Sequence, residues 1–475
     1  MRSYLCVSFT LHGLRKARPE GWQTTYNVVP VVRMEREPQS DGELNPTGTL
    51  ETRDSRQRLV ERLALSPRWF LFIALTAALA FGLKTTLALR TMGTSDIVTW
   101  KQDLKKVDTE GWEALYRDGV DSVAPSGESY HHVQVFSHPP FMLHVLPVWR
   151  WLAWATGRPL EFWVRLTCSV ADQGSLLLLC LFRARLPGLR IQPAALLLFA
   201  ASPILVLISG FHGNSDPIMM FFVLLSIYCM EIKKQPALSG VSLGLAMGIK
   251  VVAVIFAAAL LFFNPTLRDK LRFSLATIGV VLASALPYVI QNPSLILHRL
   301  SQYNSQPMLW GWSFVTAAFA DSPRYHWIYD GFMNYGKGVL LLMLVMLPIM
   351  MNWRGIRWSL LAQCGLLAFF FLFFIPGFAV QYLAWLAPWA VVLGTFPFAF
   401  HNLTAGAFLA VVYTHWCRGF PWYYANAFEV PVWSRLGLFL GLTCWFLTGV
   451  ILLLFADAWV KWNSTLQQIE AASES

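Results

Sequence analysis

The chain has 475 residues, of which 56% are hydrophobic and only 13% are charged. With a mean hydropathy of +0.48, this composition excludes a soluble domain with a water-facing surface and indicates a polytopic membrane protein. The net charge of +10 does not indicate nucleic-acid binding, because the basic residues form short clusters between apolar runs, as in charge-determined membrane topology.

The first 66 residues differ from the rest of the chain. They are polar and charged, and they contain no apolar run long enough to cross a bilayer. We expect residues 1 to 66 to be a largely disordered cytoplasmic tail, in which Met34 is an alternative start of the protein. A second, short cytoplasmic tail is expected at residues 461 to 475.

Hydrophobic segments separated by loops fill residues 67 to 460. They predict an all-α polytopic membrane domain of about 11 to 13 transmembrane helices with large outer loops at 91–138 and 291–336. The candidate segments are 68–90, 139–156, 163–182, 193–209, 216–232, 236–264, 271–290, 337–351, 358–375, 380–399, 402–416 and 434–456.

The segment 236–264 is too long for one span. At ~1.5 Å per residue it would extend ~43 Å, against a hydrocarbon core of ~30 Å. Its flanks are both basic, with Lys233 and Lys234 before it and Arg268 after it, so both ends are expected in the cytoplasm. We therefore predict a helical hairpin with Lys250 near its far tip.

This hairpin orients the remaining segments. Four connections are expected to face outside, at residues 91–138, 212–216, 291–336 and 375–382, while residues 352–358 face the cytoplasm. With a cytoplasmic N-terminus, the segments 139–156 and 163–182 cannot both cross the membrane. We expect the first of these to lie partly along the interface, because it contains Pro147 and Arg150.

Polar residues gather at the expected outer ends of several spans. His212, Asn214 and Asp216 lie between two apolar runs, Asp96 follows the first span, and His138 precedes two prolines. Some of these residues also fit ordinary structural roles. Asp96 and Asp216 are suited to helix capping, and His212 could hydrogen-bond the main chain.

Two further charges lie within apolar segments. Lys250 favours a functional role, because a charge inside an apolar hairpin is costly unless it has a partner or reaches water. For Asp172 we predict a structural ion pair with Arg165. Trp310 and Trp312 fit either an interfacial aromatic belt or a platform for a sugar or prenyl unit.

The order of four features resembles the GT-C glycosyltransferases, polytopic enzymes that use polyprenyl- or dolichyl-phosphate sugars as donors. The resemblance spans about residues 68 to 400. The features are an acidic residue in the first outer loop (Asp96), a His-Pro-Pro element (His138, Pro139, Pro140), an outer polar cluster (Gly210, His212, Asn214, Asp216) and a late aromatic element (Gln381, Tyr382, Trp385, Pro388).

The resemblance implies transfer of a hexose, with mannose or glucose favoured, to a hydroxyl of a lipid-linked or other acceptor on the outer or luminal face. It implies inverting catalysis with Asp96 as the general base. Cations or hydrogen-bond donors would stabilise the phosphate leaving group. The implied donor-phosphate ligands are Lys250, His212 and Arg299, and the implied pocket residues are His138, Asn214, Asp216, Gln381 and Tyr382.

No metal or other cofactor is expected, because a lone Asp96 does not form a paired acidic motif. A secondary transporter or lipid-sugar flippase is the alternative, but such proteins place polar groups at the membrane midplane in two related halves, and this sequence has no such repeat. A bacterial plasma membrane is favoured over the endoplasmic reticulum, since the final residues carry no retrieval signal. The sugar and the acceptor stay open.

Overall fold

The structure is a computed structural model that describes residues 65 to 474. The exceptions are residues 124–128, 187, 190, 302–305, 308–309, 354–357 and 428–432. The expected N-terminal tail therefore lies almost wholly outside the described residues, as does most of the connection at 352–358.

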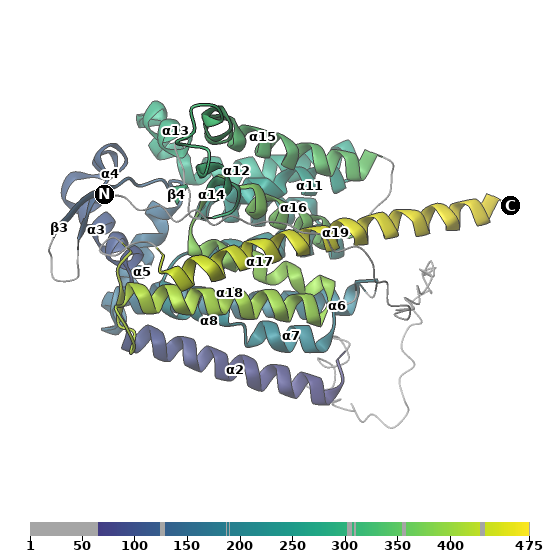
Figure 1. The fold of residues 1–475 in the computed structure, drawn as a ribbon, viewed down its shortest axis with the longest axis horizontal. Helices are drawn as coiled ribbons and strands as arrows, with labels where there is room; N and C mark the ends of the chain where they lie inside the picture. Colours follow the sequence, from purple (N-terminus) through teal and green to yellow (C-terminus); the bar gives the residue numbers. More distant parts are fainter. Residues whose placement is uncertain are drawn as a thin grey trace, which may run out of the picture. The chain divides into compact units, whose positions relative to one another are not determined.

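The described chain is helical, which confirms the expected all-α polytopic class (Figure 1). Within it, seven helical segments are long and apolar enough to cross a membrane. They are Pro67–Arg90, Leu160–Arg185, Pro193–His212, Leu267–Gln291, His326–Trp353, Thr395–Trp416 and Arg435–Trp462. Four shorter apolar segments accompany them, at Pro236–Ile249, Val251–Phe263, Leu360–Phe374 and Val380–Leu393.

The first two long helices, α2 (Pro67–Arg90) and α6 (Leu160–Arg185), pack antiparallel. Lys84 of α2 donates to Asp172 of α6 at 2.5 Å, and both side chains are buried. Arg165 instead donates to main-chain carbonyls at the end of α2, which lack partners within that helix. The expected pair of Arg165 with Asp172 is therefore wrong, because α2 supplies both residues with closer partners.

The described elements between α2 and α6 lie at one end of this helix pair (Figure 1). Helix α5 (Met142–Thr156) contains Pro147, and its Arg150 pairs with Asp108. It is not among the helices long and apolar enough to span, and its Trp154 is exposed. This agrees with the expectation that only one of the two segments 139–156 and 163–182 crosses.

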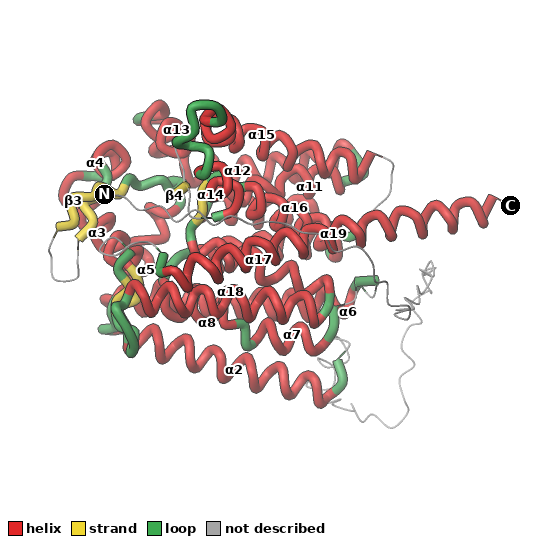
Figure 2. The backbone as a smooth tube through the Cα atoms, in the orientation of Figure 1, coloured by secondary structure: helices red, strands yellow, loops and turns green. Residues whose placement is uncertain are grey.

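The first outer segment is folded and not an open loop. It contains α3 (Ser95–Glu110), α4 (Trp112–Asp118) and an antiparallel pair of strands, β2 (Val120–Val123) and β3 (Ser129–Gln134). Strand β1 (Gly93–Thr94) pairs in parallel with β6 (Tyr424–Ala425), which follows helix α18 (Thr395–Trp416) in the chain. These short strands lie at the end of the helices that carries α3 and α4 (Figure 2).

The predicted span 193–209 is a broken helix. It consists of α7 (Pro193–Ala200), α8 (Pro203–Leu207) and η1 (Ile208–His212). Ser202 caps α8 by accepting from the main-chain nitrogen of Leu205 at 3.3 Å, and Pro203 occupies its first turn. After η1 the chain reverses into α9 (Asp216–Ile227) and η2 (Tyr228–Ile232).

The predicted hairpin is confirmed. Helix α10 (Pro236–Ile249) ends at Lys250, whose backbone is extended, and the chain returns through η3 (Val251–Phe256) and α11 (Ala257–Phe263). The amine of Lys234, just before α10, lies 5.7 Å from the ring centre of Phe263 at the end of α11. The two ends of the segment therefore meet, and Lys250 lies at the turn.

Helix α12 (Leu267–Gln291) runs parallel to α10 at close range. A Cβ atom at Gly240 would lie 2.3 Å from the carbonyl oxygen of Phe273, and one at Gly244 would lie 2.9 Å from that of Thr277. These two glycines therefore permit the approach. The following elements are α13 (Pro293–Ser301), β4 (Gln306–Pro307), α14 (Gly311–Ala317), α15 (His326–Trp353) and α16 (Leu360–Phe374).

The predicted span 380–399 is shorter than expected. Elements η4 (Val380–Tyr382), α17 (Leu383–Ala390) and η5 (Val391–Leu393) end at Gly394, which has a φ of +104°. A right-handed helix cannot continue through a residue with this φ, which glycine adopts without strain, so the helix ends there. Helix α18 (Thr395–Trp416) then begins seven residues before the expected 402. Strand β5 (Gly377–Phe378) precedes this segment and pairs with β4.

The last helix, α19 (Arg435–Glu474), has 40 residues and continues through the expected tail at 461–475. At ~1.5 Å per residue it is ~60 Å long, about twice the thickness of a hydrocarbon core. Its C-terminal part extends beyond the neighbouring helices (Figure 1).

Candidate functional site

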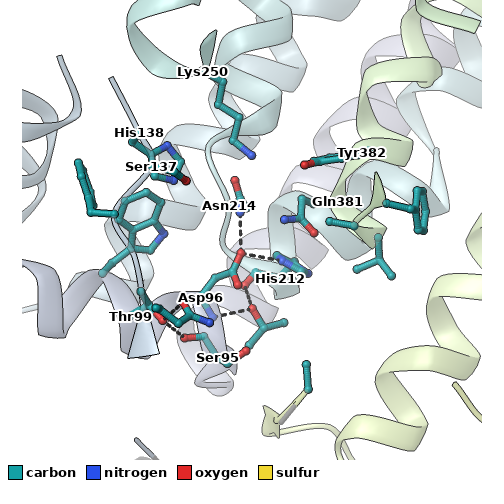
Figure 3. Close-up of a pocket in the computed structure, with 18 of the residues that line it drawn as sticks. Ser95, Asp96, Thr99, Ser137, His138, His212, Asn214, Lys250, Gln381 and Tyr382 are labelled. Carbon is teal, nitrogen blue, oxygen red and sulfur yellow. Dashed lines mark hydrogen bonds and ion pairs between the residues drawn. The ribbon is translucent and has the colours of Figure 1, made fainter. Parts of the chain in front are cut away.

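A cavity of about 310 Å³ lies where α3 begins, η1 ends and the α10–α11 hairpin turns. Side chains from segments far apart in the sequence point into it (Figure 3). Its polar lining includes Asp96, His138, His212, Asn214, Lys250, Gln381 and Tyr382.

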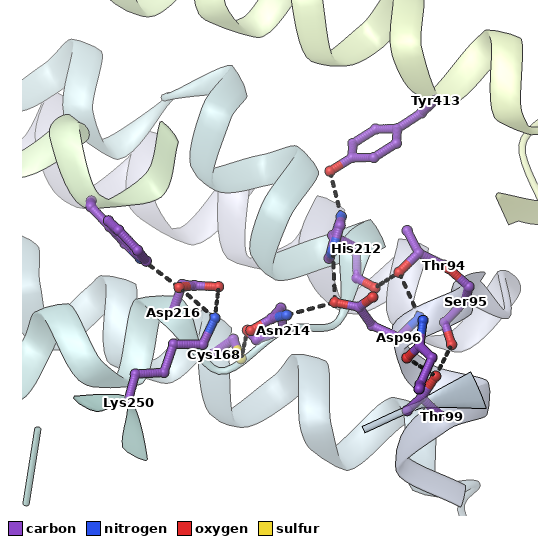
Figure 4. A network of polar contacts seen from close by, with 12 residues as sticks. Thr94, Ser95, Asp96, Thr99, Cys168, His212, Asn214, Asp216, Lys250 and Tyr413 are labelled. Carbon is purple, nitrogen blue, oxygen red and sulfur yellow. Dashed lines mark hydrogen bonds and ion pairs between the residues drawn. The ribbon is translucent and has the colours of Figure 1, made fainter. Parts of the chain in front are cut away.

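Asp96 is held by two residues of the polar cluster that follows η1. Asn214 Nδ2 donates to Asp96 Oδ2 at 2.5 Å, and His212 Nε2 lies 3.1 Å from the same oxygen (Figure 4). Gly213 makes this arrangement possible, since its φ is +86° and a Cβ atom there would lie 2.5 Å from Ile97 Cδ1. The sequence Gly-Asn after His212 thus brings both donors to one carboxylate.

Tyr413 of α18 completes the network. Its hydroxyl lies 2.8 Å from His212 Nδ1, and His212 is buried. An ionised carboxylate only accepts hydrogen bonds, so His212 Nε2 carries the proton that faces Asp96. The alternative reading of His212 as bonded to the main chain is wrong for its ring, whose partners are two side chains.

Asp96 is ionised in this environment. Burial alone would raise the pKa of Asp96, but the neighbouring His212 and the hydrogen bonds from His212 and Asn214 outweigh burial and lower this pKa from 3.8 to about 2. Asp96 is not the N-cap of α3, because that position belongs to Thr94, whose hydroxyl accepts from the Asp96 nitrogen at 3.4 Å. The Asp96 side chain keeps 28% exposure and lines the cavity.

Lys250 reaches the cavity from the hairpin turn. Its Nζ donates to both carboxylate oxygens of Asp216, at 2.8 and 2.9 Å, and lies 5.8 Å from the centre of the Tyr382 ring. Trp385 Nε1 also donates to Asp216, at 2.5 Å. Asp216 is therefore a buried anchor for Lys250 at the start of α9, and its side chain does not cap that helix.

His138 lies on the opposite wall, just before the Pro-Pro pair. Burial and the positive charge of Lys250 lower the pKa of His138 from 6.5 to about 3, so the ring is neutral at physiological pH. Its Nδ1 lies 3.5 Å from the carbonyl of Ile249, beside the hairpin turn, and its ring centre is 4.8 Å from that of Trp100.

The structure brings together seven of the nine site residues proposed from the sequence. Two lie elsewhere. Asp216 lies behind Lys250 and does not line the cavity. Arg299 of α13 donates to the main-chain carbonyls of Tyr116 and Arg117, at the end of α4, and does not line the cavity either. Its proposed contact with a donor phosphate stays a prediction.

Sequence reasoning missed other residues of the lining. They include Thr99, Trp100, Asp103, Gln134, Trp416 and Trp433. The first three share one face of α3 with Asp96, so the helical spacing after Asp96 could have indicated them.

Trp310, considered as a sugar platform, is stacked on Phe378 with ring centres 4.0 Å apart, and its Nε1 donates to the carbonyl of Leu372.

Among the residues described, no three His, Cys, Asp or Glu side chains are grouped closely enough to hold a metal ion. Neither a family model nor a curated protein matches this chain. The residues of the cavity supply an anion that can accept a proton and a cation that can face a developing negative charge.

Proposed function

We propose that the protein is a membrane glycosyltransferase that moves a hexose from a polyprenyl-phosphate donor to an acceptor hydroxyl, with inversion at the anomeric carbon. The observation that carries this proposal is the position of Asp96. An ionised carboxylate lines the same cavity as Lys250, at the ends of several apolar helices. A donor whose phosphate is attached to a lipid tail would present its sugar at this boundary.

In the proposed reaction, the acceptor oxygen attacks the anomeric carbon while its proton passes to an oxygen of Asp96. The bond between the anomeric carbon and the phosphate oxygen breaks, and the polyprenyl phosphate leaves with its electron pair. Asp96 acts as the general base, and His212 and Asn214 fix its orientation.

Lys250 faces the phosphate in this proposal. Preorganised cations stabilise a negative charge that develops on a leaving group, and the effect is large in a site that excludes water. Asp216 and Trp385 hold the lysine in place, so the charge needs little reorganisation when the donor binds. Mannose and glucose are the sugars that we propose for the donor, and a bacterial plasma membrane is the proposed location of the protein.

The experiment is transfer by the purified full chain in detergent, without any membrane gradient. Radiolabelled polyprenyl-phosphate mannose and glucose are supplied separately, together with glycoside acceptors, and the anomeric configuration of the product is determined. Asp121→Asn, which changes an exposed carboxylate of β2, is the control variant and keeps full activity.

Inverted product formed by the wild type and by this control supports the proposal. A chain that cleaves neither donor, yet moves lipid-linked sugar between the leaflets of vesicles, is a flippase and not a transferase.

A further inference from the structure

The cavity contains a second carboxyl group to which the proposed reaction assigns no role. Asp103 lines the cavity, is 2% exposed, and has no hydrogen-bond or ion-pair partner among the residues that the structure describes. Burial without a compensating cation raises the pKa of Asp103 well above 3.8. Buried polar groups are normally hydrogen-bonded, so this one lacks a partner that a bound molecule could supply.

Asp103 and Asp96 lie on the same face of α3. Seven residues separate them, which places them two turns and ~10 Å apart along the helix axis, with only ~20° of rotation between them. Thr99 lies between them and also lines the cavity. A molecule that contacts both carboxyl groups must therefore extend along α3.

Two other polar atoms beside the cavity also lack partners. The indole Nε1 of Trp100 is buried without an acceptor, and Asn214 Oδ1 is buried without a donor, as far as the structure describes the chain. Trp100 is three residues before Asp103 and thus its neighbour on the helix surface. The cavity wall therefore offers an unpaired donor next to an unpaired carboxyl group.

A sugar hydroxyl matches this combination, because it donates one hydrogen bond and accepts others. It could donate to Asp103 and accept from Trp100 Nε1. A serine or threonine acceptor has a side chain with only one hydroxyl. That hydroxyl would contact Asp96 as the attacking group, so the side chain has no second hydroxyl to contact Asp103.

We propose that Asp103 and Trp100 bind hydroxyl groups of the acceptor, and that the acceptor is a glycan of at least two sugars extended along α3. This inference rests on the proposed function, since it takes Asp96 as the site of attack. It gives Asp103 the role of a specificity-determining residue, while Asp96 carries the proton transfer.

The test compares acceptors and variants with the full chain in detergent and a labelled polyprenyl-phosphate hexose as donor. The acceptors are the octyl glycoside of a disaccharide, the octyl glycoside of a single sugar, and a serine-containing peptide. The wild type is expected to prefer the disaccharide. Asp103→Leu, similar in size but apolar, raises the KM for the disaccharide roughly 10- to 100-fold, with a much smaller change in kcat.

Two further variants keep the test informative if Asp103→Leu does not fold. Trp100→Phe keeps an aromatic ring but removes the indole N–H, so the disaccharide KM rises about 2- to 10-fold. Glu110→Leu removes an exposed carboxylate from the end of the same helix and leaves all constants unchanged.

The outcomes separate the two proposals. A wild type that transfers hexose while Asp103→Leu and Trp100→Phe keep the normal disaccharide KM overturns the inference alone, and water is then the partner of these groups. Equal use of the peptide and the disaccharide overturns it as well. A wild type that cleaves no donor overturns the proposed function itself.

Discussion

The imidazole Nε2 of His212 lies 3.1 Å from the carboxylate of Asp96, although 116 residues separate them in the chain. Two further contacts hold these residues in place. The Thr94 hydroxyl, at the start of α3, donates to the His212 carbonyl at 2.8 Å, and β1 pairs with β6 beside it. The start of α3 is thus attached to the end of η1, which fixes the carboxylate relative to its two donors.

The first prediction concerns Asp96 as the base. Asp96→Asn keeps the size of the side chain and removes its ability to accept a proton, so turnover falls roughly 10²- to 10⁴-fold while the protein still folds. Single-turnover transfer from a polyprenyl-phosphate hexose measures this, with variants matched for thermal stability. Near-normal transfer by Asp96→Asn would remove this residue from the mechanism.

The second prediction concerns pH and His212. The pKa of Asp96 is lowered from 3.8 to about 2, so the anion needed for catalysis persists above that range and is lost as the pH falls through about 2. His212→Gln removes the electrostatic attraction that opposes burial, and the pKa of Asp96 rises. The acid limb of kcat/KM therefore moves to higher pH in this variant, measured between about pH 2 and 8.

Tyr413→Phe is the control for this experiment. It removes the hydroxyl that contacts His212 Nδ1 but leaves the contact of His212 with Asp96. Its acid limb shifts less than that of His212→Gln. Identical profiles for the wild type and His212→Gln would show that His212 does not set the ionisation of Asp96.

The third prediction concerns sidedness. The cysteine of Glu110→Cys, in the exposed last turn of α3, is labelled by an impermeant thiol reagent from outside. The cysteine of Lys233→Cys, before the hairpin, is labelled only from the cytoplasm. Labelling is measured as the increase over the unmodified chain. The opposite pattern would place the cavity on the cytoplasmic side.

Apolar length and flanking charge predicted the helical class and the hairpin around Lys250, because the bilayer constrains both directly. They did not predict helix breaks such as the one at Gly394, which depend on single backbone conformations. Helical spacing, which suggested an ion pair between Arg165 and Asp172, gave the wrong partner for both residues. These residues are seven apart on α6 and could face each other, but α2 offers each a better partner, and helix pairing is not visible in one sequence.

The sequence also predicted part of the candidate site. Lys250 and His212 were proposed because polar or charged side chains are unusual beside apolar segments, and both line the cavity. Tyr413 was missed, since a tyrosine in an apolar helix carries no signal until its partner is known. Arg299 was proposed for its charge near the boundary, but its guanidinium is directed at main-chain carbonyls of α4.

The fourth prediction concerns the buried pair of Lys84 and Asp172. Lys84→Met leaves a buried carboxylate without its cation, which costs about 3 to 5 kcal/mol of stability. Lys84→Met combined with Asp172→Leu recovers most of that loss, because neither charge remains. Thermal unfolding in detergent measures the stability. The double variant is expected to transfer hexose normally, since neither residue lines the cavity.

The last prediction separates anchoring from catalysis at Lys250. Lys250→Met leaves Asp216 buried without its cation, so thermal stability falls, again by about 3 to 5 kcal/mol. Adding Asp216→Asn removes the unpaired charge and keeps an oxygen that can accept from Trp385 Nε1, so stability largely returns. Transfer does not return with it. If Lys250 stabilises the leaving phosphate, kcat of the double variant stays roughly 100-fold or more below the wild type.

The double variant at Lys84 and Asp172 is the matched control, because it also replaces a buried ion pair by uncharged side chains but lies outside the cavity. In that control, stability recovers and transfer is normal. If the double variant at Lys250 and Asp216 also recovered both, the lysine would serve only to satisfy Asp216. The phosphate would then need another cation. Arg299, the arginine that the sequence analysis proposed beside Lys250 and His212, would have to leave the carbonyls of α4 to reach it.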